Sequence, residues 1–165
     1  MPVDLYESVK GDYFIGCADG LALSDDTSCW ARLYNPSDSC VNLHVNVWTI
    51  TEISTAPFRA EFWFNADAPS SYTPSQNVIC SNTAFCSVPT PQIELQMASN
   101  VTDEPNCGTM AYVRCGEPIT TLVGSDDGKL IFKPGGSLLI FLSLINCDST
   151  TASASIAFGW WEEEI

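Results

Sequence analysis

The chain has 165 residues, with 20 acidic and 6 basic side chains and a formal net charge of −14. That length fits one domain, which can bury about 70% of its unfolded surface, so we expect no cofactor to be needed for folding. The negative charge repels phosphate backbones and anionic bilayers, so we expect no nucleic acid partner and no membrane insertion. Because 45% of the residues are hydrophobic, the acidic residues are expected to cover a packed globular core.

Residues 1–11 are mixed in character and are punctuated by Pro2 and Gly11. We interpret them as an N-terminal arm ahead of a domain that spans residues 12–165. The segment lacks a basic region followed by an apolar run, so we expect no secretory signal peptide. We also find no stretch with a helical period or with the length of a membrane span.

From Asp12 onward the pattern is that of short strands. The clearest one covers residues 40–51, where Val41, Leu43, Val45 and Val47 alternate with polar neighbours or Trp48. A second alternating run follows Pro57, and we interpret it as the antiparallel partner of the first. Further strands are predicted over residues 13–17, 29–34, 92–98, 109–115, 119–123 and 153–161.

Lys129 to Leu144 contains the longest apolar run of the chain. Pro134 and the two glycines after it predict a tight turn, so we interpret this stretch as a hairpin whose second strand, Leu138 to Leu144, is buried on both faces. Roughly nine or ten short strands predict an all-β fold, a single-domain β-sandwich that is jelly-roll-like. The long connection over residues 65–87 favours Greek-key crossings.

Side chains that could support catalysis are sparse. His44 is the only histidine, and we find no G-x-S-x-G motif, so His44 is interpreted as a strand residue on a polar face. The acidic pairs Asp25–Asp26, Asp103–Glu104 and Asp126–Asp127 lie in turn-like contexts, where Asp is favoured for its bonds to the backbone. A calcium site at Asp126 and Asp127 is a minor alternative. We therefore expect no enzymatic activity and assign no catalytic or metal-binding residue.

The eight cysteines are an even number and high for a reducing cytosol. Their spacings lack the close pairs of a structural zinc site, so disulfides within or between subunits are favoured and buried free thiols are the alternative. The connectivity stays open because eight cysteines allow about 105 pairings. The disulfide candidates are Cys17, Cys29, Cys40, Cys80, Cys86, Cys107, Cys115 and Cys147.

Three tryptophans, Trp48, Trp63 and Trp161, are predicted on the strand faces opposite the apolar residues. Outward aromatic side chains indicate either a subunit interface or a platform for a sugar. We favour the interface, and a glycan stays open as an alternative partner. The arm adds the interface candidates Pro2, Val3, Leu5 and Tyr6.

Several blocks resemble an uncharacterised family of small all-β proteins from spore-forming bacteria: CADGLALS, WARLYNPS, VNVW, FWFNADAP, KLIFKPGGSLLIFL and AFGWWEE. More loosely, the arm, the strand pattern, the PGGS corner and the cysteines resemble endospore appendage fibre subunits. That resemblance implies pairing of sheet edges between protomers and a disulfide-bonded N-terminal connector. Residues 1–16 contain no cysteine, so here the arm would have to act without a covalent bond.

We therefore expect a structural subunit that assembles with itself into an extracellular or spore-surface fibre. Release by lysis of the mother cell would reconcile the cysteines with the missing signal peptide. The alternative is a carbohydrate-binding or adhesin-like β-sandwich module.

Overall fold

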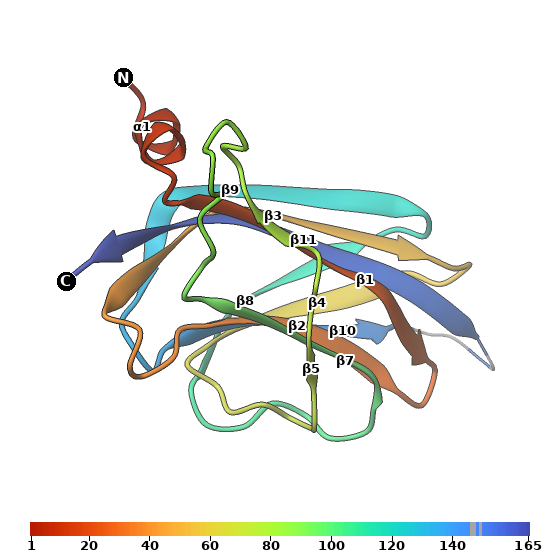
Figure 1. Ribbon diagram of the computed structural model, residues 1–165. Helices are drawn as coiled ribbons and strands as arrows, with labels where there is room; N and C mark the ends of the chain where they lie inside the picture. The colour runs from red at the N-terminus through yellow and green to blue at the C-terminus, as the bar shows by residue number, and fades with distance from the viewer. Residues whose placement is uncertain (146–147, 149) are drawn as a thin grey trace.

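The computed structural model describes residues 1–145, 148 and 150–165. In this part of the chain it contains one short helix and eleven strands in two layers (Figure 1). The elements are α1 (Val3–Lys10), β1 (Tyr13–Ser24), β2 (Ser28–Tyr34), β3 (Val41–Ile53), β4 (Phe58–Phe64), β5 (Thr73–Pro74), β6 (Val78–Cys80), β7 (Glu94–Val101), β8 (Thr109–Gly116), β9 (Thr120–Phe132), β10 (Ser137–Leu144) and β11 (Thr151–Glu164).

The strands form two antiparallel sheets that face each other. Sheet A has the order β6-β1-β11-β3-β9, and sheet B has the order β5-β7-β2-β10-β4-β8. Apart from β7, the described part of the chain has eight long strands, and each lies in the opposite sheet from the one before it, except that β4 and β8 are paired neighbours in sheet B. As a result, β1-β11-β3-β9 faces β2-β10-β4-β8. This is the strand order of a jelly roll with two Greek keys. The predicted all-β sandwich is therefore confirmed.

Strand β10 lies in the middle of sheet B and is buried on both faces, as predicted. Leu138, Ile140 and Leu142 belong to the core between the sheets, while Leu139 and Phe141 belong to a second apolar cluster on the outer side of sheet B. The turn before β10 has a Gly135 φ of 86°, and the Gly136 N–H donates to the Lys133 carbonyl at 2.8 Å. The hairpin interpretation is wrong, because β9 belongs to sheet A and β10 to sheet B.

Three other predictions about local structure are corrected. Strand β4 does not pair with β3; it pairs with β10 and β8 in the opposite sheet. The predicted turn at residues 125–128 is a wide bulge inside the single strand β9. The arm contains the helix α1, whose side chains are all exposed or half-buried, and Gly11 ends it with a φ of 93°.

One carboxylic acid lies at the end of the core. Glu52 follows the inward-facing Ile50 on β3, has no solvent-exposed surface, and has no hydrogen-bond partner for its carboxylate oxygens among the described residues. Burial is the main cause that raises the pKa of Glu52; the nearby Ser54 hydroxyl, which itself donates to the Ala56 carbonyl, offsets this in part. The fold therefore favours the protonated form of Glu52.

We expect Glu52→Gln to remove a pH dependence of stability. The pKa of Glu52 is higher in the folded chain than in the unfolded one, so its contribution is present at low pH and is lost as the pH rises from about 4.3 through the raised value. Above that range the variant should be more stable than the wild type, because Gln carries no charge that burial penalises. Urea unfolding across this pH range measures the difference.

The exposed Glu117 provides the matched control. Glu117→Gln should leave the pH dependence of unfolding at the wild-type level. A Glu52→Gln protein that follows the same pH profile as the wild type would contradict the assignment.

Candidate assembly edges and surface sites

The two sides of the sandwich end in strands of very different length. One side is bordered by β8 and β9, which have 8 and 13 residues, and the other by β5 and β6, which have 2 and 3 residues. Figure 1 shows β9 running along the margin of its sheet. We call the side bordered by β8 and β9 the open side. Unpaired backbone N–H and C=O groups of an edge strand can bond to another chain.

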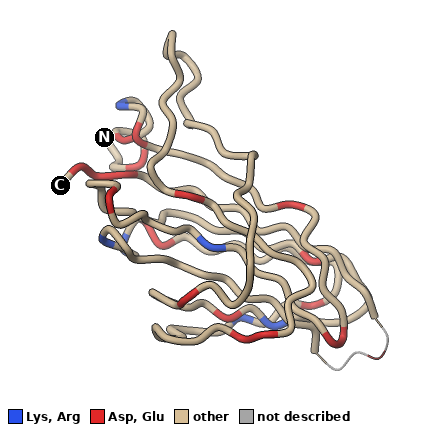
Figure 2. The backbone as a smooth tube through the Cα atoms, turned by 60° about the horizontal axis from the view of Figure 1, so that its bottom comes forward, with Lys and Arg blue, Asp and Glu red and all other residues tan. Residues whose placement is uncertain are grey.

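Few charges lie on the open side. Strand β8 carries Arg114 as its only charged residue, and the charges of β9 fall in the stretch Asp126 to Lys129. Figure 2 shows acidic positions along much of the rest of the chain, with a group at the C-terminal end. Thr120 to Ser125 is thus an uncharged edge segment in a strongly acidic protein.

The arm residues predicted as interface candidates are on the surface. Val3, Leu5 and Tyr6 of α1 are 57%, 51% and 52% exposed, and Pro2 precedes the helix and is exposed as well. An isolated helix of this length is marginal in water, so contacts to the rest of the chain or to another molecule must support it.

Trp48 is not an outward side chain; this prediction is wrong. It is 5% exposed, packs in the core with ring centroids 4.7 Å from Phe62, and donates its indole N–H to Asp126 Oδ2 at 3.2 Å. The cause is a bulge: Asn46 is skipped in the pairing of β3 with both β11 and β9. One extra residue reverses the alternation, so Trp48 turns inward and Val47 outward.

Trp161 lies on the outer face of sheet A as predicted, but it is buried at 6% exposure. The ring stacks on His44 with centroids 5.1 Å apart, and the β9 bulge covers it at Gly128. Trp161 is therefore unavailable at the surface of the isolated chain.

The two ring nitrogens of His44 contact the β9 bulge and β11. Nδ1 faces the Gly128 carbonyl oxygen at 3.1 Å and Nε2 faces Glu163 Oε2 at 3.0 Å. Both partners are acceptors, and the tautomer of the ring decides which nitrogen donates. The His44 bond is the main cause that lowers the pKa of Glu163. His44 is thus a packing residue that ties β3 to the bulge and to the C-terminal end of β11.

Trp63 points to the outer side of sheet B, as predicted. It is half-buried against the second apolar cluster, and its indole N–H donates to Glu61 Oε1 at 3.1 Å. Trp63 is thus the one of the three predicted tryptophans with a partly accessible face.

All seven described cysteines are free thiols in this structure. Cys29 and Cys80 are buried in the core, and Cys17 is half-buried. Cys147 lies outside the described residues. The four exposed thiols are Cys40, Cys86, Cys107 and Cys115, the last of them on the edge strand β8.

The acidic pair Asp126–Asp127 does not converge on a common point. Asp126 accepts from Trp48, while Asp127 accepts from Ser125 Oγ at 3.0 Å and from Lys129 Nζ at 3.3 Å. Burial is the main cause that raises the pKa of Asp126. Across residues 1–145, 148 and 150–165 no group of three or more His, Cys, Asp or Glu side chains is arranged to hold a metal ion.

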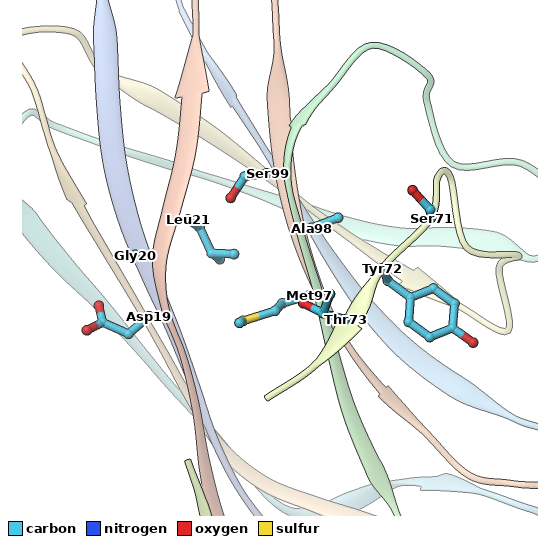
Figure 3. A pocket seen from close by; sticks show the side chains of 9 residues that line it. All are labelled: Asp19, Gly20, Leu21, Ser71, Tyr72, Thr73, Met97, Ala98 and Ser99. Atoms are coloured by element: carbon cyan, nitrogen blue, oxygen red, sulfur yellow. The ribbon is translucent and has the colours of Figure 1, made fainter. Parts of the chain in front are cut away.

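A pocket of about 320 Å³ lies between β1, β5 and β7 (Figure 3). Leu21 and Met97 occupy its middle, while the Tyr72 ring is directed away from it. The Asp19 carboxylate is already engaged, because it accepts a short hydrogen bond from Ser155. The polar groups of this pocket therefore do not converge on a reacting centre of the kind an active site needs.

We expect Gly128→Ala to destabilise the protein strongly. Gly128 has a φ of 71°, and a Cβ there would collide with the Trp161 ring. Overpacking and the left-handed backbone together should cost about 2–5 kcal/mol of unfolding free energy, measured by urea titration. Gly20 is the matched control: its φ is 66°, but no atom lies within 4 Å of its Cβ position. Gly20→Ala should cost only about 1–2 kcal/mol, and equal losses would contradict the role of Gly128.

In the described part of the chain, no helix has the length and hydropathy needed to span a bilayer. No curated protein matches the chain. A family match extends over the whole sequence, residues 1–165. The chain belongs to the family of unknown function DUF6143.

Proposed function

We propose that this protein is a structural subunit that assembles with itself by pairing sheet edges between copies. The observation that carries the proposal is the unequal length of the edges: β8 and β9 leave one long open side, whereas β5 and β6 are very short. Monomeric sandwiches usually shorten, charge or cover such edges. A second copy that adds its strand here would satisfy the unpaired backbone groups.

The charge distribution supports the same side. Two copies with a net charge of −14 repel each other, and the repulsion is smaller at β8 and Thr120–Ser125, which carry no carboxylate. Several apolar side chains on the open side are exposed to solvent: Ile119, Val123, Ile131 and Met110 are 71%, 70%, 55% and 41% exposed. Burying such side chains contributes roughly 1.5–3 kcal/mol each when the burial is complete.

The bulge in β9 limits where pairing takes place. Residues Asp126 to Lys129 do not pair with β3, and their charged side chains lie at the edge of the sheet. Bulges and charges of this kind prevent another strand from pairing with an edge. We therefore place the pairing on Thr120–Ser125 and on β8. Pairing of the open side with itself yields a closed dimer, whereas pairing with the β5 and β6 side of the next copy yields an open fibre.

The proposed assembly is an extracellular or spore-surface fibre, in line with the resemblance to endospore appendage subunits. In an oxidising environment, the four exposed thiols among the described residues can form disulfide bonds between copies. A sugar platform on Trp48 receives no support, because that ring is buried in the core.

We expect Val123→Lys to prevent assembly while leaving the fold intact. Val123 is exposed in the uncharged segment of β9, so lysine is tolerated in the monomer but brings an unpaired charge into the interface. A concentration series of purified protein, followed by light scattering after gel filtration and by negative-stain microscopy, should show filaments for the wild type and monomers for the variant.

Val88→Lys is the matched control, since Val88 is an exposed valine in the loop between β6 and β7. This variant should assemble like the wild type. A wild-type protein that stays monomeric at high concentration, under both oxidising and reducing conditions, would contradict the proposal. A closed dimer that forms no filaments would contradict the proposal of a fibre.

Thiol titration tests the contribution of disulfides. We expect filaments isolated under oxidising conditions and then denatured to show fewer than 8 free thiols, because the four exposed cysteines are accessible to oxidation. The buried Cys29 should stay reduced, since burial raises the pKa of its thiol. Eight free thiols in such filaments would exclude covalent bonds between copies.

A further inference from the structure

A guanidinium group is buried on the outer side of sheet B, and no carboxylate of the described residues lies within ion-pair distance of it, although Asp67 and Glu94 act on it from farther away. Arg32 of β2 is 7% exposed, and it forms none of the ion pairs found within the described residues. The Arg32 Nε and Nη2 groups donate to Gln96 Oε1 at 2.9 and 2.6 Å, and Nη1 donates to the Ala66 carbonyl at 3.1 Å. These bonds leave two of the five N–H groups of the guanidinium without an acceptor in the described part of the chain.

Three aromatic rings surround this cation. The Arg32 Cζ atom lies 4.8 Å from the Tyr34 ring centroid, 5.8 Å from Tyr72 and 6.0 Å from Trp30. The rings replace part of the lost hydration by cation–π attraction, but they bring no negative charge. A buried cation that keeps unused donors is costly unless an anion completes it.

A cavity of about 370 Å³ opens at this cluster. Arg32, Tyr34 and Tyr72 line it together with Asn65, Asp67 and Ser137. Figure 3 shows the Tyr72 ring directed away from the neighbouring pocket drawn there, and the ring contributes to the Arg32 cavity as well. The volume is that of a site for a small molecule, with aromatic walls and a few polar groups.

We propose that this cavity binds a small organic carboxylate. The carboxylate oxygens accept hydrogen bonds from the two free N–H groups of Arg32, and the rest of the ligand packs against Tyr34 and Tyr72. A carboxylate matches the single positive charge and the planar donor fork of the guanidinium. A phosphate ester would add a second negative charge beside Asp67 in an acidic protein, so it fits less well. This site does not depend on self-assembly.

Asp67 sets the selectivity of the cavity. Its carboxylate lines the cavity and carries the same sign as the ligand, and it also accepts a bond from the Cys107 thiol, which raises the pKa of Cys107. Asp67→Asn removes this repulsion without enlarging the cavity. We therefore expect the variant to bind carboxylates several-fold more tightly than the wild type, and an unchanged affinity would contradict the placement of the ligand next to Asp67.

Calorimetric titration of the full chain with matched probes tests the ligand class. Galacturonate is compared with galactose, and N-acetylphenylalanine is compared with its C-terminal amide. The carboxylate member of at least one pair should bind about tenfold more tightly than its neutral counterpart or its amide, and the pair that responds identifies a sugar acid or a peptide terminus as the source. Binding that is equal within both pairs, or absent from both, would overturn the proposal.

Variants and NMR tie any binding to this cavity. Arg32→Gln should abolish binding. Tyr72→Ala, which keeps Arg32, should weaken binding several-fold. Tyr6→Ala on α1 is the control that should leave binding unchanged. If Arg32→Gln fails to fold, the NMR signals of the guanidinium Nε groups in the wild-type protein show where the ligand binds. Titration should shift the Arg32 resonance, and shifts confined to Arg59 or Arg114 would refute the site.

Discussion

The burial of β10 on both faces is the constraint on which the arrangement of this protein depends. Its alternate side chains fill the core and the outer apolar cluster, so β10 must lie inside sheet B with β2 and β4 as neighbours. Each fully buried leucine, isoleucine or phenylalanine contributes roughly 1.5–3 kcal/mol, which is lost if the strand moves to an edge. With β10 and β4 fixed inside the sheet, β8 is left on the outside, and with β9 it forms the open side.

Local sequence patterns predicted the class of fold and the buried strand, but not which strands pair. The Pro-Gly-Gly turn marks the start of β10, and the apolar run after it predicts burial on both faces. The turn itself carries no information on whether the chain stays in one sheet or crosses to the other. The same limit applies to β3 and β4, which follow each other in sequence and lie in opposite sheets. The helix α1 has only 8 residues, too few for a clear period.

Side-chain orientation failed to follow from alternation where a bulge intervenes. Asn46 has no sequence signature that marks it as the extra residue, yet it alone places Trp48 in the core. Arg32 shows a related limit: its strand was predicted, but its burial depends on Tyr72 and Ala66 in a distant connection. The sites with unusual electrostatics, Glu52 and Arg32, thus depend on contacts between segments that sequence periodicity does not reveal.

We propose that the open side pairs between copies. Hydrogen–deuterium exchange of the backbone amides, compared between dilute and assembled protein, tests it most directly. We predict new protection in β8 and in Thr120–Ser125 upon assembly, while the exchange of the amides of the Asp126–Lys129 bulge stays unchanged. Assembled particles in which β8 and Thr120–Ser125 exchange as fast as in the monomer would contradict it.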